Sequence, residues 1–296
     1  MTPSHLILWL TAMLWGTAFV AQSEGTQLLG AYSFNAARFI CALIALFPLL
    51  FIFPSKQEYP LKTLVLGGLL SGFLLFVAFS FQQSGLNYVS AGDAGFITSI
   101  YIVFVPLFGI LLGHKTNLKT WLGISFALIG FYYLAVGPNF NVNYGNILEL
   151  SGALFWAFHV LTIAYFSSKL PAIPLALMQF LIAALLSSLA AFYFEKPTLV
   201  HFQQEWLPIL YTGIIASGLA RTLQIIAQKK VSASICALIL STEALFAVIA
   251  DWLFFGVTLT ANAYIGSGLI LVGLLISQWP APQTFPKRQK IFRKDT

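Results

Sequence analysis

Hydrophobic residues form long, nearly continuous stretches along this chain, divided by short polar or turn-rich breaks. The runs at 43–53 and 64–81 are examples. Lipid allows only helices or closed barrels to span it, and barrel strands alternate apolar and polar residues over short segments. Long apolar runs therefore predict helices, each needing about 20 mainly apolar residues. Ten are expected, near residues 5–22, 31–53, 62–82, 90–112, 119–137, 147–168, 172–194, 206–227, 233–255 and 262–279.

Composition supports lipid as the solvent of this chain. Hydrophobic residues make up 59% and charged residues 8% of the 296 positions, whereas a soluble domain carries about 25% charged residues. The fold class is thus predicted to be an all-α polytopic membrane protein. The first four residues lack the basic region of a cleavable signal peptide, so the first stretch is expected to be retained as a span. Cys41 and Cys236 fall inside predicted spans and are expected to serve ordinary packing.

Basic residues divide unequally between the two sides of the predicted bundle. If every second connection shares a side with both termini, the other side holds only Lys196. Because Lys and Arg are enriched in cytoplasmic loops, both termini are predicted to be cytoplasmic. This asymmetry accounts for the net charge of +6 without a nucleic-acid partner. The favoured side holds Lys56, Lys62, Lys115, Lys119, Lys169, Lys229, Lys230, Lys287, Arg288, Lys290, Arg293 and Lys294.

The second half of the chain repeats the first at a nearly constant offset of about 141 to 143 residues. Val89-Ser90-Ala91 returns as Val231-Ser232-Ala233, and Arg38-Phe39 is matched by Gln179-Phe180. One matched dipeptide would be chance, but a constant offset along the whole chain is not. Further pairs are Trp15 and Trp156, Gln82 and Gln224, Ser99 and Ser241, Gly123 and Gly266, and Gly130 and Gly273.

Five spans per repeat is an odd number, so the second repeat enters the membrane from the opposite side. The chain is therefore predicted to contain two inverted five-helix repeats, at 1–140 and 145–281, followed by a basic tail at 282–296. Many secondary transporters have this plan, with a substrate site near the midplane between the repeats. The tail either contacts anionic lipid or acts only as a topology signal.

Two segments resemble a known family. The first half reads Ser90-Ala91-Gly92-Asp93-Ala94-Gly95-Phe96 and later Tyr101-Ile102-Val103-Phe104-Val105-Pro106, and the second half carries Leu238-Ile239-Leu240-Ser241-Thr242-Glu243. The chain resembles the EamA-type branch of the drug/metabolite transporter superfamily. The resemblance implies an inner-membrane carrier, often an exporter of amino acids, nucleobase derivatives or similar small metabolites. Glutamates that often follow the fourth and ninth spans in that family are missing here, at Gly113-His114-Lys115 and Gly256-Val257-Thr258.

Charged side chains at membrane depth are costly, so they are candidates for function and are expected to have partners. Arg221 is expected to pair with Glu243, either as a lock between helices or as part of a gate or substrate site. Arg38 is expected to meet Asp93 near the outer mouth, or to bind a carboxylate or phosphate. Two further acids, Glu149 and Asp251, are expected at the wet interface.

Further candidates come from repeat mates and aromatic residues. Gln82, Gln224 and Gln179 are predicted to line a shared cavity, with interhelical hydrogen bonding as the alternative. His159 is a candidate for a coupling proton or, alternatively, for packing. Trp15, Trp156 and Tyr101 are predicted to form an aromatic wall. The full predicted substrate-binding set is Trp15, Arg38, Gln82, Tyr101, Trp156, His159, Gln179, Arg221, Gln224 and Glu243.

The predicted function is secondary transport of small metabolites, such as amino acids or related amphipathic solutes, by export or exchange through alternating access. No P-loop pattern is present, so a gradient or exchange must supply the energy. A lipid or lipid-carrier translocase is the alternative, and a membrane-embedded enzyme fits less well because its usual motifs are missing. Expected partners are a small-molecule substrate and membrane lipid, with protons or a counter-substrate. No cofactor, metal or nucleic acid is expected, and the chain is expected to be a monomer or a homodimer.

Overall fold

The computed structural model describes residues 2–25, 28–55, 57–135, 143–256, 258 and 260–278. Within these residues every regular element is a helix, as the sequence predicts. The first half contains α1 (Pro3–Gly25), α2 (Ala31–Leu46), α3 (Leu49–Ile52), α4 (Leu61–Gly85), α5 (Ala91–Ser99), α6 (Tyr101–Leu111) and α7 (Leu118–Ala135). The second half contains α8 (Tyr144–Ser167), α9 (Ala172–Phe194), α10 (Leu199–Gln204), α11 (Trp206–Leu210), the π-helix η1 (Tyr211–Leu219), α12 (Ala220–Gln228), α13 (Ala233–Leu240), α14 (Glu243–Phe255) and α15 (Ala261–Gln278).

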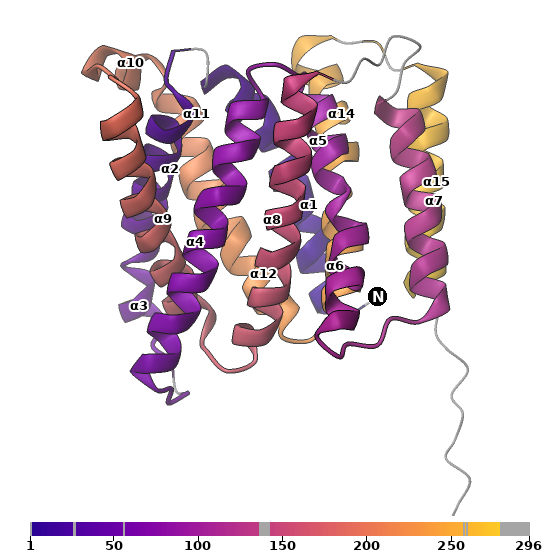
Figure 1. Cartoon of the computed structure of the whole chain (residues 1–296), viewed down its shortest axis with the longest axis horizontal. Coiled ribbons are helices and arrows are strands. Elements are labelled where there is room, and N and C mark those ends of the chain that lie inside the picture. Colours follow the sequence, from indigo (N-terminus) through magenta and orange to yellow (C-terminus); the bar gives the residue numbers. More distant parts are fainter. Residues whose placement is uncertain are drawn as a thin grey trace, which may run out of the picture.

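The long helices lie side by side along a common direction (Figure 1). Eight helical segments of the described chain are long and apolar enough to cross a membrane. The other two apolar helices, α7 and α15, have 18 residues each. The chain is therefore a multi-pass helical membrane protein, while the count of ten spans stays a prediction.

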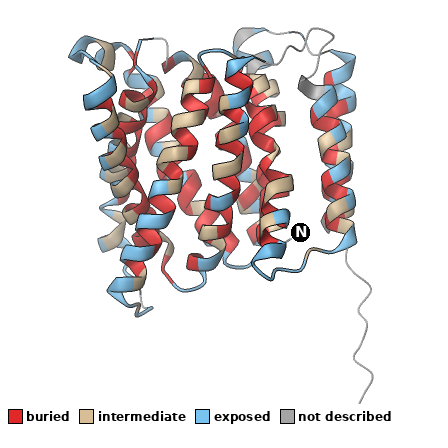
Figure 2. Cartoon of the chain, viewed as in Figure 1, coloured by how far each residue is buried: buried red, intermediate tan, exposed pale blue. Residues whose placement is uncertain are grey.

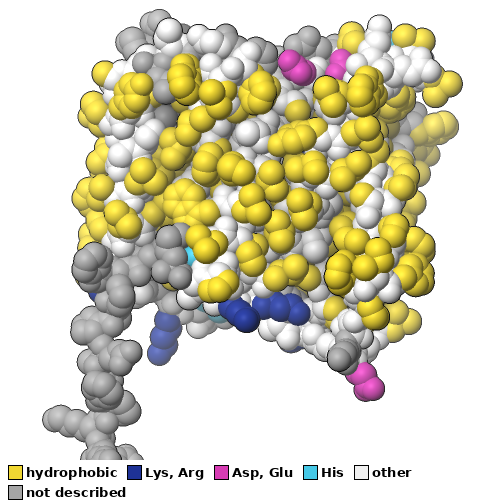
Figure 3. Space-filling model, turned by 180° about the vertical axis from the view of Figure 1, so that it is seen from behind, with side chains coloured by type: hydrophobic (Ala, Val, Ile, Leu, Met, Phe, Trp, Pro, Cys, Tyr) yellow, Lys and Arg dark blue, Asp and Glu magenta, His cyan; other side chains and the backbone are white. Residues whose placement is uncertain are grey.

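The surface of the bundle is apolar along its sides and basic at one end. Large hydrophobic side chains such as Phe192 (81% exposed) and Leu275 (67% exposed) point outward, and Figure 2 shows buried residues concentrated on the inner helix faces. Figure 3 shows Lys and Arg gathered at one end of the visible face, below a broad hydrophobic belt. This distribution suits a protein whose sides face lipid and whose ends face water.

Local sequence signals set several helix ends. The Ser90 hydroxyl caps α5 by accepting a hydrogen bond from the Asp93 N–H at 3.1 Å, and Asn143 and Asn146 form a capping box at the start of α8. Such side chains satisfy N–H groups that have no partner in the first helical turn. Gly256, with φ of 66°, ends α14 in a left-handed conformation that glycine adopts without strain.

Three predicted spans are divided in the structure. The span expected at 31–53 turns at Phe47–Pro48 between α2 and α3, where proline offers no N–H to continue the helix. The spans expected at 90–112 and 233–255 are each broken near their middle, at Ile100 and at Ser241–Thr242. The last two breaks fall at equivalent positions of the two repeats, and together they position the site described below.

Helices α7 and α15 pack closely against each other at one side of the bundle (Figure 1). A Cβ atom added to Gly123 would lie 2.6 Å from the carbonyl oxygen of Gly273, and one added to Gly130 would lie 2.6 Å from that of Gly266. Small residues permit such close helix approach. Gly273 is the repeat mate of Gly130, and Gly266 is the repeat mate of Gly123. Each glycine of α7 therefore contacts the mate of the other one, as a two-fold axis between α7 and α15 requires.

Candidate functional site

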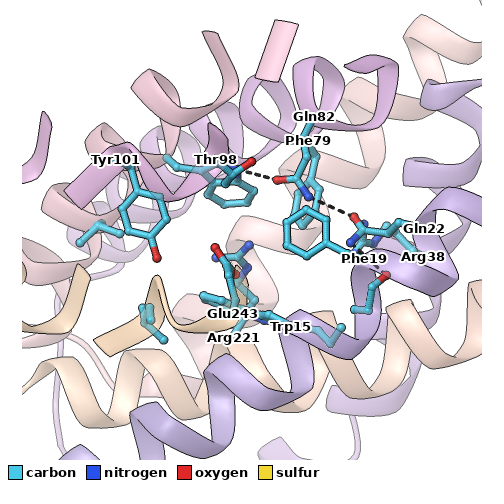
Figure 4. Close-up of a pocket in the computed structure, with 15 residues that line it drawn as sticks. Trp15, Phe19, Gln22, Arg38, Phe79, Gln82, Thr98, Tyr101, Arg221 and Glu243 are labelled. Carbon is cyan, nitrogen blue, oxygen red and sulfur yellow. Dashed lines mark hydrogen bonds between the residues drawn. The ribbon is translucent and has the colours of Figure 1, made fainter. Parts of the chain in front are cut away.

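A narrow cavity lies inside the bundle where helices of both halves meet (Figure 4). Its volume is about 30 Å³, which is room for about one or two waters. The structure is therefore closed to a solute of metabolite size. The lining residues are Trp15, Ala18, Phe19, Gln22, Arg38, Phe79, Gln82, Thr98, Tyr101, Trp156, Val160, Ala216, Arg221, Leu240 and Glu243.

The Arg221 guanidinium is held between the rings of two tryptophans. Its central carbon lies 4.0 Å from the ring centroid of Trp15 and 4.1 Å from that of Trp156. Each indole is fixed in turn, because Trp15 Nε1 donates to the Ala216 carbonyl and Trp156 Nε1 to Gln82 Oε1, both at 2.8 Å. Two repeat mates from opposite halves thus clamp one cation by cation–π contacts.

Glu243 faces the same cavity but does not form the expected ion pair with Arg221. Both side chains are 5% exposed, and no N···O distance of 4.0 Å or less joins charged groups among the described residues. Instead, Glu243 is the first residue of α14, where the positive end of the helix dipole stabilises a carboxylate. Its repeat mate Tyr101 is the first residue of α6, and the Tyr101 hydroxyl is buried without a hydrogen-bond partner.

Arg38 forms a different set of contacts from those expected. Its Nη1 donates to Gln22 Oε1 at 2.7 Å and its Nε donates to Ser217 Oγ at 3.3 Å, while the guanidinium lies 4.1 Å from the Phe79 centroid. The predicted contact with Asp93 is not formed in the described structure: the Asp93 carboxylate accepts from the Ser90 hydroxyl at 2.8 Å at the start of α5. Arg38 is thus a second buried cation on the cavity wall.

The helix breaks meet at the cavity. Ser99, the last residue of α5, donates its hydroxyl to the Ser241 carbonyl at 3.1 Å, so two repeat mates touch. The Ser241 and Thr242 hydroxyls donate to the carbonyls of Leu238 and Ile239 at 2.8 and 2.7 Å. These bonds occupy backbone carbonyls near the break, as membrane depth requires.

Three of the predicted site residues lie behind the cavity wall. His159 Nε2 and Gln179 Oε1 are 3.0 Å apart, and His159 also packs edge-on against Trp156. Gln224 Oε1 accepts from Arg221 Nη1 at 3.4 Å, and its amide donates to Gln228 Oε1 at 3.3 Å. The structure places these residues as supports of the wall, whereas the other seven predicted residues line the cavity itself.

The expectation that Glu149 lies at the wet interface is wrong. Its side chain is 0% exposed, and it accepts a hydrogen bond from Thr98 Oγ1 at 3.1 Å. The helix end that hydropathy places near water is covered here by α4 and α5. The side chain of Asp251, assigned to the same interface, lies outside the described residues.

Several lining residues were not found from the sequence. Gln22 and Thr98 are polar residues in apolar spans, which is a usable signal, but their orientation toward the cavity is not visible in a hydropathy pattern. Phe79 is one of 28 phenylalanines in the chain, and only the fold shows that it contacts Arg38. Phe79 and Arg221 are 142 residues apart, so they are repeat mates, and the sequence alone could have shown this pairing.

The chemical groups on the cavity wall suit the binding of an ionised small molecule. Among the described residues, no group of three or more His, Cys, Asp or Glu side chains lies close enough to hold a metal ion. The cavity instead presents two guanidinium groups, one carboxylate, a phenol and aromatic faces. Such groups bind an ionised small molecule by charge and its apolar part by ring contact.

Comparison with known proteins agrees with this architecture. Many membrane transporters are multi-pass helical bundles with a polar cavity between two repeated halves. The model of the EamA-like transporter family matches the chain twice, at residues 2–136 and 143–279, and the chain belongs to that family. The twofold match confirms the predicted resemblance, within the drug/metabolite transporter superfamily.

Individual relatives support the same class. An "Uncharacterized transporter" of Archaeoglobus fulgidus is 31% identical over 92% of this chain and 85% of its own length. The "Uncharacterized transporter YoaV" of Bacillus subtilis is 23% identical over 94% and 96%. A solved crystal structure aligns with a TM-score of 0.79 over 95% of this chain and 99% of that one, at 19% identity. This last similarity shows the fold alone.

Proposed function

We propose that the protein is a secondary transporter of small ionised metabolites, such as amino acids or related amphipathic solutes, with the central cavity as its substrate site. The arrangement of Arg221 and Glu243 carries this proposal. Each charge is buried, and no described residue forms an ion pair with either of them at an N···O distance of 4.0 Å or less. A zwitterion offers both complements, a carboxylate for Arg221 and an ammonium group for Glu243. Aromatic faces of Trp15 and Trp156 then contact its apolar part.

The position of the cavity supports alternating access as the mechanism of the proposed transporter. It lies between the repeats and is closed in this structure, so a solute can enter only when one half moves relative to the other. The breaks at Ile100 and Ser241–Thr242 divide spans beside the lining residues Thr98 and Glu243. Helix segments separated by a break can tilt independently, which makes these breaks the expected hinges of opening.

The cellular setting is part of the same proposal. The basic end of the bundle is proposed to face the cytoplasm, with both termini on that side of the inner membrane, because Lys and Arg are enriched in cytoplasmic loops. Export or exchange, driven by protons or by a counter-substrate, fits a chain without a nucleotide-binding motif. A monomer contains a whole cavity, and a homodimer would contain two.

Uptake and exchange by purified protein in liposomes tests the proposal. A suitable panel is radiolabelled leucine, phenylalanine, glutamate, uridine and glucose 6-phosphate, with a fluorescent phospholipid measured in parallel. We expect exchange of a zwitterionic member and no movement of the lipid. Lipid flipping without movement of any solute would favour the lipid translocase and contradict the proposal.

A further inference from the structure

A second buried acid lies outside the substrate cavity. Glu149 stands in the second turn of α8, is 0% exposed and packs against the end of α4. The contact depends on Gly85, because a Cβ atom there would lie 2.5 Å from Glu149 Oε1. The fold thus makes room for a carboxyl group among closely packed helices.

The hydrogen bonds of Glu149 are incomplete. Oε2 accepts from Thr98 Oγ1 at 3.1 Å, whereas Oε1 is buried without a partner among the described residues. No cation in the described part of the chain pairs with Glu149. None of the ionisable residues on α8 and on the helices packed against it forms a hydrogen bond or ion pair with Glu149. These residues are Lys62 on α4, Asp93 on α5, Tyr101 on α6, Tyr144, His159 and Tyr165 on α8, Arg221 on α12 and Cys236 on α13.

An ionised carboxylate is costly in such a place. It would lack water and a countercharge, and a single hydroxyl hydrogen bond does not replace them. A neutral acid avoids this cost, so these surroundings favour the protonated form of Glu149. An alkali cation would require several oxygen ligands, whereas a proton requires only one atom.

Thr98 connects this acid with the substrate site. The Thr98 side chain donates to Glu149 and also lines the central cavity. Thr98 belongs to the last turn of α5, directly before the break at Ile100. A tilt of α5 would therefore move Thr98, the one side chain that donates to Glu149 among the described residues.

We propose that Glu149 is the site of a coupling proton that is bound while the cavity is closed and released when it opens. The acid transfers its proton to an entering water molecule, which gives a carboxylate and a hydronium ion, and the reverse transfer reloads it. His159 is less suited to this task, because its ring does not line the cavity and its Nε2 lies 3.0 Å from Gln179 Oε1, whereas Glu149 is bonded to the lining residue Thr98. The proposal rests on the transport function proposed above.

Infrared spectroscopy of the purified chain tests proton binding without any solute. We expect a carbonyl stretching band of a protonated acid that is lost in Glu149→Gln and retained in Asp93→Asn, a control on the neighbouring helix. Thr98→Val keeps the acid but removes its hydrogen bond, so the band should shift rather than vanish. Identical spectra for wild type and Glu149→Gln would overturn the proposal.

Transport in liposomes tests coupling, using the panel solute that the wild type exchanges. A pH gradient should drive wild-type accumulation, while Glu149→Gln should lose this accumulation but still exchange solute for solute. Asp93→Asn should behave as wild type. Accumulation by Glu149→Gln equal to wild type, or accumulation driven by sodium instead, would overturn the coupling proposal alone. Absence of any exchange by the wild type would instead overturn the proposed function, and coupling with it.

Discussion

At the scale of single residues, the three charges on the cavity wall are stabilised in three different ways. Arg221 lies between two indole rings, Arg38 donates to Gln22 and Ser217, and Glu243 stands at the start of a helix. None of these three arrangements places the charged group in an ion pair. The three charged groups can therefore bind a solute, although burying them costs desolvation free energy.

The clamp around Arg221 predicts a difference between substitutions. Arg221→Lys keeps the charge but loses the planar group that stacks on both rings, contacts worth about 0.5–2 kcal/mol each. We expect a raised KM with normal insertion for Arg221→Lys, and a near loss of transport for Arg221→Ala and Glu243→Gln. Initial rates in liposomes measure this. Lys62→Gln, an exposed charge removal, is the control; unchanged rates in Arg221→Ala and Glu243→Gln would remove both residues from the site.

The sequence predicted this site in part. Repeat pairing selected Trp15 and Trp156, and the cost of a charge at membrane depth selected Arg221; the structure brings these three residues together. The prediction for Glu149 failed, since hydropathy places a residue along a helix but does not show which other helices cover that helix end. The direct Arg221–Glu243 pair was wrong for a related reason: similar depth does not determine the distance between two side chains.

At the scale of helices, the breaks in the fourth and ninth predicted spans were not visible in the sequence. A hydropathy window averages over about 19 residues, so a gap of one residue at Ile100, or two at Ser241–Thr242, disappears. The surrounding residues are as apolar as in a continuous helix. The repeat offset between Ser99 and Ser241 was the available signal, because polar mates at mid-span indicate a shared special feature.

The close contact between α7 and α15 predicts a packing effect away from the cavity. Gly130→Ala places a Cβ atom 2.6 Å from the Gly266 carbonyl oxygen, so the helices must separate, at a cost of about 1–3 kcal/mol. We expect a lower thermal unfolding midpoint in detergent. Gly268→Ala on α15 is the matched control, because no atom lies within 4 Å of its added Cβ. Equal midpoints for the two variants would contradict the glycine contact.

At the scale of the whole molecule, the distribution of basic residues predicts which end faces the cytoplasm. In a background with Cys41 and Cys236 replaced by alanine, Lys196→Cys and Lys230→Cys place single exposed thiols in connections at opposite ends of the bundle. We expect an impermeant maleimide to label Lys196→Cys in intact cells, and Lys230→Cys only after permeabilisation. The reverse labelling pattern would invert the proposed topology.

The overall arrangement was more predictable than its details. The membrane setting follows from the low charge content, since no water-facing surface can be built from so few charged residues, and the helical class follows from the long continuous apolar runs. The two matched halves follow from the constant offset between repeats. The closed state of the cavity does not follow from any of these patterns, because it depends on how side chains such as Phe79 and Trp156 fill the space between helices.

The exchanged glycine contacts of α7 and α15 have an evolutionary consequence. Gly123 meets Gly273 and Gly130 meets Gly266, so each partner presents the same surface to the other, as in an isologous dimer. In a dimer of a half-length ancestor, with its two copies inserted in opposite orientations, each such contact would occur twice, once on each side of the two-fold axis. Gene duplication and fusion then needed only one connecting segment to fix the two orientations in a single polypeptide, after which each half was free to diverge, as Arg38 and its mate Gln179 have done.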